Sequence, residues 1–162
     1  MMVEEGRAAP DVTLQATGGR SFSISAHRGR PLVVYFYPKA DTSGCTKQAC
    51  DFQEALTSFN SAGIDIVAIS PDPLPALEKF AAKYGLQFPL ASDHDKAAAQ
   101  AYGTWVQKSM YGRSYMGMER ATFLIDANGT LSRIWRRVRV PGHVKEVAAA
   151  AKALNNEASL RA

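Results

Sequence analysis

The stretch Leu32-Val-Val-Tyr-Phe-Tyr-Pro-Lys-Ala-Asp-Thr-Ser-Gly-Cys-Thr-Lys-Gln-Ala-Cys50 decides the fold. Its apolar first part indicates a buried strand, and the residues from Cys45 onward begin an amphipathic pattern that indicates a helix. The chain has two cysteines, Cys45 and Cys50, and both lie here. A cysteine at a strand-to-helix turn meets free N–H groups and the positive end of the helix dipole, which favour the reactive thiolate.

Apolar residues recur at helical spacing after this turn. They form a stripe that predicts one buried helix face: Cys45, Ala49, Phe52, Leu56 and Phe59. Cys50 lies off the stripe. A step of five residues in a helix places two Cα atoms about 8–9 Å apart, beyond the roughly 7 Å limit for a disulfide. Either the two cysteines never pair, or the turns that carry them unwind when they do.

A structural role is the alternative for these cysteines, because free cysteine often packs as a small buried hydrophobe. The residues before Cys45 favour a reactive role instead. Gly44 permits close approach of the backbone, and Thr42 and Ser43 supply hydroxyls at the expected helix N-terminus. A zinc site is not favoured, because the three histidines show no ligand spacing. A thioredoxin-type active site is not favoured either, because its Cys-x-x-Cys motif is absent.

Length and composition predict one domain over residues 1–162. A hydrophobic content of 46% and a charged content of 21% are typical of soluble globular proteins. No apolar run approaches the roughly 18 residues that span a bilayer, and the acidic start does not resemble a signal peptide. We therefore expect a cytoplasmic protein without membrane contact, where a cysteine pair is more typical of catalysis than of structure.

The net charge is +4, and the densest basic run is Arg133-Ile-Trp-Arg-Arg-Val-Arg139. Nucleic-acid binding is one interpretation, since Trp135 is interleaved with the arginines. A strand with a solvated basic side is favoured, because the run follows the hairpin turn signal Asn128-Gly129. We expect no nucleic-acid partner.

The signature Pro38-x-x-x-Thr42-x-x-Cys45 resembles the active-site motif of the peroxiredoxins. The wider string from Val34 to Cys50 resembles the peroxiredoxin Q branch, also called bacterioferritin co-migratory protein. The resemblance extends over most of the chain and includes residues 9–14, 69–72, 88–93, 102–105 and 120–126. The signature is specific, because a proline, a threonine and a cysteine at these offsets after a strand rarely coincide by chance.

The order of the remaining patterns agrees with this resemblance. We expect strands at residues 12–14, 21–24, 32–37, 65–70, 88–91, 121–126 and 131–138, and helices at 45–62, 73–84, 95–102 and 141–156. Residues 108–118, rich in glycine, tyrosine and methionine, are expected to form a loop. The predicted class is α/β, a thioredoxin-like fold in which helices flank a central mixed sheet that starts with an N-terminal β-hairpin.

The resemblance implies a thiol peroxidase that reduces hydrogen peroxide and alkyl hydroperoxides. Cys45 would attack a peroxide oxygen and become a sulfenic acid. Arg120 and Thr42 would hold the peroxide and stabilise the moving charge, and Pro38 would shield the sulfenate from water. Without the resemblance, each has a structural interpretation: a surface arginine, a helix cap and a strand terminator.

Cys50 would then form an intramolecular disulfide with Cys45, and thioredoxin would reduce it. The resemblance implies no cofactor or metal and favours a monomer. Gln48 has no clear role, and an exposed helical glutamine is its structural interpretation. Two alternatives stay open: a non-catalytic thioredoxin-like module for redox sensing or protein holding, and a one-cysteine peroxidase in which Cys50 is incidental.

Overall fold

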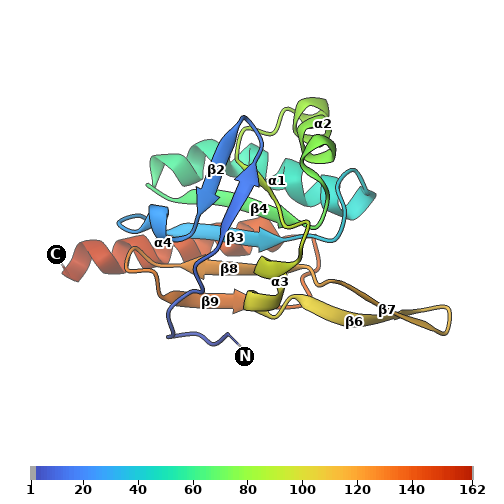
Figure 1. Ribbon diagram of the computed structural model, residues 1–162. Coiled ribbons are helices and arrows are strands. Elements are labelled where there is room, and N and C mark those ends of the chain that lie inside the picture. Colours follow the sequence, from blue (N-terminus) through green and yellow to red (C-terminus); the bar gives the residue numbers. More distant parts are fainter. Residues whose placement is uncertain (1–2, 162) are drawn as a thin grey trace.

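The computed structural model describes residues 3–161, with side chains through residue 154. Seven strands form one sheet in the order β2-β1-β5-β4-β3-β8-β9 (Figure 1). Their bounds are β1 Thr13–Ala16, β2 Arg20–Ser23, β3 Leu32–Phe36, β4 Asp65–Ser70, β5 Leu90–Ser92, β8 Ala121–Ile125 and β9 Leu131–Trp135. The pairs β3–β4 and β4–β5 are parallel, and the others are antiparallel. The predicted mixed sheet and N-terminal β-hairpin are therefore confirmed.

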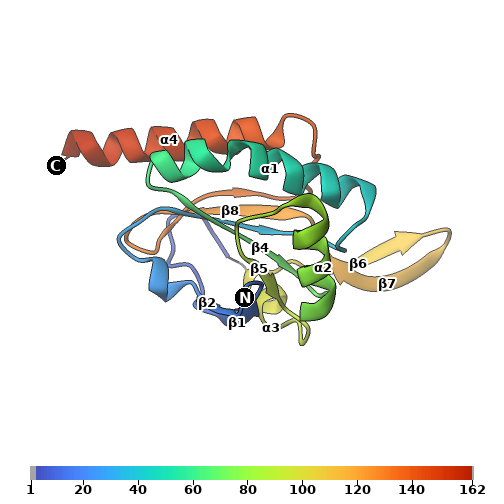
Figure 2. The same ribbon diagram turned by 90° about the horizontal axis from the view of Figure 1, so that it is seen from above.

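Helices cover both faces of the sheet. Helices α1 (Ser43–Ser61) and α4 (His143–Arg161) lie side by side on one face (Figure 2). Helix α2 (Leu74–Tyr84) contributes Leu77 and Phe80 to the same core, whereas α3 (Ala97–Tyr102) packs into a second core across the sheet. A short 3-10 helix spans Ser25–His27. Within residues 3–161, no helix has the length and apolar character to cross a membrane.

Strand β3 lies between the two cores. Val33 and Tyr35 face the core under α1, while Val34 and Phe36 belong to the opposite core, so an uninterrupted apolar run is required. The helical stripe packs against β3 as predicted, with Cys45, Ala49, Phe52, Leu56 and Phe59 all buried. Tyr35 stacks on Phe52 with ring centroids 4.5 Å apart. This packing fixes the end of β3 and the start of α1 relative to each other.

The prediction of a loop at residues 108–118 is wrong. Strands β6 (Trp105–Met110) and β7 (Arg113–Met118) form a separate antiparallel hairpin that projects from the body (Figures 1 and 2). Tyr111 and Gly112 make its turn, both with positive φ, as a type I′ hairpin turn requires. Most of the hairpin is exposed on both faces, so its sequence lacks the alternation that marks a half-buried strand.

Smaller differences concern the ends of elements. Strand β9 stops at Trp135 rather than residue 138, because the chain turns at Arg137, which has a φ of 47°. Helix α4 begins at His143 rather than residue 141 and extends past residue 156 to Arg161. Strand β5 starts at Leu90 instead of residue 88. The single domain over residues 1–162 stays a prediction, and its residues 1, 2 and 162 lie outside the described part.

Candidate active site

The loop between β3 and α1 is held by the neighbouring strand. Because β3 and β4 are parallel, their carboxyl ends meet at one edge of the sheet. Just beyond β4, Asp72 Oδ2 accepts hydrogen bonds from the Ser70 hydroxyl and the Ala40 backbone N–H, each at 2.8 Å. The beginning of the loop is thereby fixed to the end of β4.

The next residue connects the loop to α2. Asp41 has a φ of 62°, a left-handed conformation that aspartate tolerates better than most residues. Its carboxylate accepts hydrogen bonds from the Tyr84 hydroxyl at 2.7 Å and from Lys83 Nζ at 2.9 Å. The bond from Tyr84, followed by that from Lys83, lowers the pKa of Asp41. We call these contacts among Asp41, Lys83 and Tyr84 the α2 latch.

Cys45 is 1% exposed in the first turn of α1. The register pairs Phe36 of β3 with Ala121 of β8, so Arg120 emerges at the same edge of the sheet. Its Nη2 lies 3.3 Å from Cys45 Sγ, and its Nη1 donates to Gln48 Oε1 at 2.7 Å. The predicted pairing of Arg120 with Cys45 is present, and the guanidinium places positive charge and N–H donors beside the sulfur.

Gly44 gives the guanidinium its space. A Cβ atom at this position would lie 3.2 Å from Arg120 Nη2, tighter than nine in ten real Cβ contacts. The inference that glycine here permits close backbone approach is therefore confirmed, and the group that approaches is the arginine. A Cβ atom at residue 44 would require the guanidinium to shift by a few tenths of an ångström.

Thr42 occupies the N-cap position of α1, but its hydroxyl caps nothing. The hydroxyl donates to the Lys39 carbonyl at 2.8 Å, so the expected side-chain cap at Thr42 is wrong. The lone pairs of the hydroxyl stay available, and the side chain is exposed near the first turn. Pro38 is half-buried in the loop after β3. Its shielding of Cys45 stays a prediction.

Cys50 lies one and a half turns further along α1 and is half-buried. Both cysteines are free thiols, and the helix is continuous from one to the other. The i, i+5 separation in an intact helix is the geometry that keeps them apart. The described structure is therefore the reduced, folded arrangement.

Gln48 and Lys108 are polar groups at the site whose placement the sequence did not predict. Gln48 is fully buried rather than exposed, and its Nε2 has no hydrogen-bond partner within the described part of the chain. Lys108 of β6 donates to the Met118 carbonyl. Burial, and secondarily the charge of Arg120, lowers the pKa of Lys108. Gln48 could have been found from its spacing of three residues after Cys45, but Lys108 carries no local signal.

His143 at the start of α4 is a further polar group near the site whose placement the sequence did not predict, and it is buried. Its Nε2 lies 2.8 Å from the Thr122 hydroxyl, and Trp135 packs edge-on against the ring. Burial lowers the pKa of His143 to about 4, and the charge of Arg120 acts in the same direction. A neutral imidazole therefore supports β8 two residues from Arg120.

Together these residues form a thiol beside a fixed cation in a water-poor setting. Such an arrangement can hold a thiolate, orient a small polar oxidant and stabilise charge that moves onto its oxygens. Within residues 3–161, no group of three or more histidine, cysteine, aspartate or glutamate residues is placed to bind a metal ion.

A comparison with protein-family models matches residues 6–134 to the AhpC/TSA family. The chain belongs to this family of peroxiredoxins. It is 43% identical over 147 residues to a putative peroxiredoxin bcp of Coxiella burnetii, covering 91% of this chain and 97% of the relative. It is 41% identical over 152 residues to peroxiredoxin Bcp of Xanthomonas campestris, covering 94% and 95%.

Solved structures agree with this assignment. Xanthomonas campestris peroxiredoxin Q, at 42% identity, superposes with a TM-score of 0.85 over 89% of this peroxiredoxin and 91% of that chain. A Xylella fastidiosa PrxQ variant gives a TM-score of 0.85 at 31% identity over 93% of this chain and 98% of that one. The thioredoxin-like fold is confirmed. As a member of the family, the protein is a thiol peroxidase that acts with thioredoxin-type reductants, and this favours catalysis over a non-catalytic module.

Proposed function

We propose that Cys45 is the peroxidatic cysteine and that Cys50 resolves it. The observation that carries the first assignment is the 3.3 Å contact between Arg120 Nη2 and Sγ of the buried Cys45 in the first turn of α1. Within residues 3–154, Cys50 receives no hydrogen bond like the one from Arg120 to Cys45, and its interaction with a cation is a longer-range one with Lys47, which supports the order of events.

The first step is attack of the Cys45 thiolate on one oxygen of a hydroperoxide. The S–O bond forms as the O–O bond breaks, and the leaving oxygen takes up a proton to become an alcohol or water. The sulfur is oxidised to a sulfenic acid and the peroxide is reduced. Arg120 N–H groups stabilise charge on the oxygens, the Thr42 hydroxyl holds the peroxide, and Pro38 limits access of water to the sulfenic acid.

In the second step the Cys50 thiol attacks the sulfenic sulfur. The disulfide forms, and the hydroxyl leaves as water. A dithiol protein, thioredoxin in our proposal, then reduces the disulfide through a mixed disulfide and restores both thiols. The separation along α1 supports unwinding of the first turns between the two steps, since the intact helix keeps the sulfurs from bonding.

Alkyl hydroperoxides and hydrogen peroxide are the proposed substrates. A structural study of the Xanthomonas campestris bacterioferritin comigratory protein, 41% identical to this chain, concerns its alkyl peroxide reduction activity. The reducible cysteine pair supports a reducing compartment, the cytoplasm. We further propose that the protein acts as a monomer, because the cysteines that the reaction needs lie on one helix.

The test is thioredoxin-dependent peroxide reduction, followed by NADPH oxidation with thioredoxin reductase. We expect sustained turnover by the wild type, none by Cys45→Ser, and a single reduction of peroxide without sustained turnover by Cys50→Ser. Structures of the Xanthomonas campestris relative include two cysteine-to-serine variants, whose positions lie much further apart than the two cysteines of this chain, so that fold accepts serine at a cysteine position. Turnover by Cys45→Ser would contradict the first assignment.

The one-cysteine peroxidase is the second candidate. It is favoured by the half-burial of Cys50 and by the continuous helix between the cysteines. Sustained turnover with thioredoxin in Cys50→Ser would establish it and would remove the resolving role of Cys50.

A further inference from the structure

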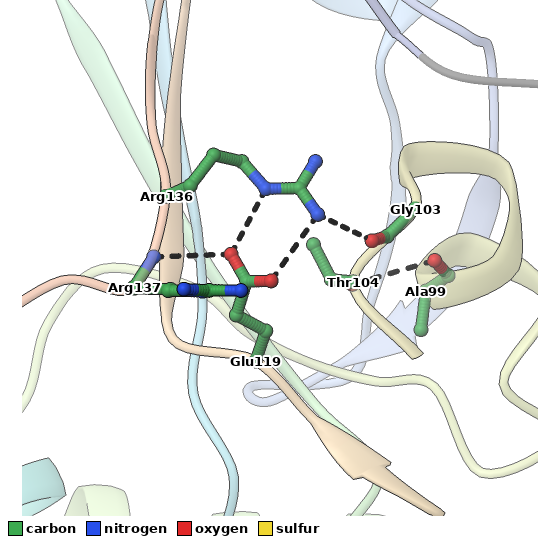
Figure 3. A network of polar contacts seen from close by, with 6 residues as sticks. All are labelled: Ala99, Gly103, Thr104, Glu119, Arg136 and Arg137. Atoms are coloured by element: carbon green, nitrogen blue, oxygen red, sulfur yellow. Dashed lines mark hydrogen bonds and ion pairs between the residues drawn. The ribbon is translucent and has the colours of Figure 1, made fainter. Parts of the chain in front are cut away.

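Glu119 precedes Arg120, and its carboxylate is the centre of a polar network at the edge of the sheet (Figure 3). Oε2 accepts from Arg136 Nε at 2.9 Å and Oε1 from Arg136 Nη2 at 3.2 Å, a bidentate pair. Oε2 also accepts from the Arg137 backbone N–H at 3.0 Å. The Glu119 side chain is only 12% exposed, so these contacts are shielded from water more than most surface pairs.

The same network reaches the end of α3. Arg136 Nη2 donates to the Gly103 carbonyl at 2.6 Å, and the Glu119 backbone N–H donates to the Thr104 carbonyl at 2.7 Å. Glu119 is therefore fixed through both its backbone and its side chain. The partners lie on two different segments, one after α3 and one after β9 (Figure 3).

The segment after β9 that contacts Glu119 also binds the backbone of Arg120. The Val138 N–H donates to the Arg120 carbonyl at 2.9 Å. Arg137, which directly precedes Val138, has a φ of 47°, a conformation unfavourable for arginine. The hydrogen bond from its backbone N–H to Glu119 stabilises this conformation. The backbone of residues 119 and 120 is thus clamped before the Arg120 side chain extends to Cys45 and Gln48.

We infer that Glu119 and Arg136 are positioning residues, which hold the Arg120 guanidinium against the Cys45 sulfur. This inference rests on the proposed role of Arg120. Neither side chain contacts Cys45, so both act by fixing the position of the Arg120 backbone. A displacement of about 1 Å at a reacting group lowers rates by up to roughly 100-fold, and we expect a loss of 10- to 100-fold in the peroxide rate constant when the pair is broken.

If Glu119 and Arg136 acted only through their charges, their removal would change the Cys45 thiolate in a different way than if they position Arg120. Removing Glu119 takes away a negative charge near Arg120 and would favour the thiolate, whereas removing Arg136 takes away a positive charge and would disfavour it. A positioning role predicts the same direction for both changes, because each releases the Arg120 backbone. The pH midpoint of Cys45 alkylation reports the thiolate directly and needs no peroxidase turnover.

The experiment compares Glu119→Ala, Arg136→Ala and the double variant with the full-length Cys50→Ser protein. All of them carry Cys50→Ser, so that iodoacetamide reports Cys45 alone. We expect both single variants to shift the alkylation midpoint to higher pH and to slow peroxide reduction. The peroxide rate constant of the double variant should be no lower than that of the slower single variant, because each single variant already breaks the Glu119–Arg136 pair. Arg136→Lys, which keeps the charge and one contact, should recover part of the loss.

Arg133→Ala is the matched control, because it breaks an exposed ion pair of 3.2 Å with Glu146 and Arg133 does not contact residues 119–120. It should leave the midpoint and the rate unchanged. If Glu119→Ala fails to fold, Glu119→Gln keeps the size and one acceptor, and should give a smaller shift in the same direction. Opposite shifts in Glu119→Ala and Arg136→Ala, or wild-type values in both, would overturn the inference. A wild type without peroxidase activity would instead refute the proposed function.

Discussion

Cys45 and Gln48, three residues apart on α1, share one guanidinium. Arg120 contacts the sulfur through Nη2 and the amide oxygen through Nη1, at 3.3 Å and 2.7 Å. Residues at i and i+3 face the same side only while the helix is intact. The arginine therefore contacts both groups in the folded first turn, and unwinding that turn would separate them.

Replacing Arg120 by alanine should slow the reaction of Cys45 with peroxide by about 10²–10³-fold, the usual loss when one fixed donor to developing charge is removed. Stopped-flow fluorescence with hydrogen peroxide measures the rate constant. Arg133→Ala also removes one positive charge, from an exposed arginine, and serves as the control. An unchanged rate constant in Arg120→Ala would exclude a role in the transition state.

Thr42→Val should lower the peroxide rate constant while the helix stays formed. The hydroxyl makes no capping bond, so the stability loss should be limited to its one bond to the Lys39 carbonyl, about 1 kcal/mol. Thr42→Ser keeps the hydroxyl and should retain most of the activity. Urea unfolding and stopped-flow kinetics separate the two effects. Equal activity in Thr42→Val and Thr42→Ser would show that the hydroxyl does not hold the peroxide.

Oxidation to the Cys45–Cys50 disulfide should reduce hydrogen-exchange protection at residues 45–52. Strand β3, Leu32–Phe36, should keep its protection, because its pairing with β4 and β8 does not depend on α1. Unwinding the first turn of α1 breaks no side-chain capping bond at Thr42. The free-energy cost of losing the helix-dipole interaction is only about 0.3–1 kcal/mol. Unchanged protection of 45–52 in a homogeneous disulfide form would contradict local unfolding.

Weakening the α2 latch should favour the unwound state. The double change Lys83→Met and Tyr84→Phe removes both donors to Asp41 without altering its backbone. Disulfide formation should become faster, and inactivation by excess peroxide should need a higher concentration, because the sulfenic acid is resolved sooner. Arg7→Met, which removes an exposed ion pair with Glu4 outside α1 and α2, is the control. Slower resolution in the double variant would refute the role of the latch.

His143 should make stability depend on pH. Its pKa is lowered from 6.5 to about 4, mainly by burial, with Arg120 in the same direction and Glu146 opposing. The unfolded chain therefore binds a proton more readily than the folded one between these values. The stability from the neutral imidazole is present above pH 6.5 and is lost as the pH falls toward 4. In urea unfolding between pH 4 and 7, His143→Gln should flatten this dependence, whereas the exposed His94→Gln should not.

The sequence predicted the centre of the molecule better than its edges. The buried strand at residues 32–37 and the stripe from Cys45 to Phe59 are dictated by burial, which leaves a periodic pattern. The β6–β7 hairpin packs on no core, so its composition suggested a loop. At the site, the resemblance to the peroxiredoxins pointed to Cys45, Thr42, Arg120 and Pro38. The contact between Arg120 and Cys45 is present in the structure, and the roles of these residues stay predictions. The contacts of Asp41 with Tyr84 and of Glu119 with Arg136 join residues distant in sequence, and nothing local specifies them.

The bond between the Ala40 N–H and Asp72 sets how far Cys45 can travel when the helix turn melts. With Ala40 held, five residues, 41–45, form the tether, and a chain of that length spans at most about 18 Å. On the other side, four residues separate the cysteines. So short a linker gives Cys50 an effective concentration in the millimolar range or above at the Cys45 sulfur. A second protein molecule would have to exceed that concentration to capture the sulfenic acid first, so the proposed disulfide forms within one chain in dilute or crowded solution alike.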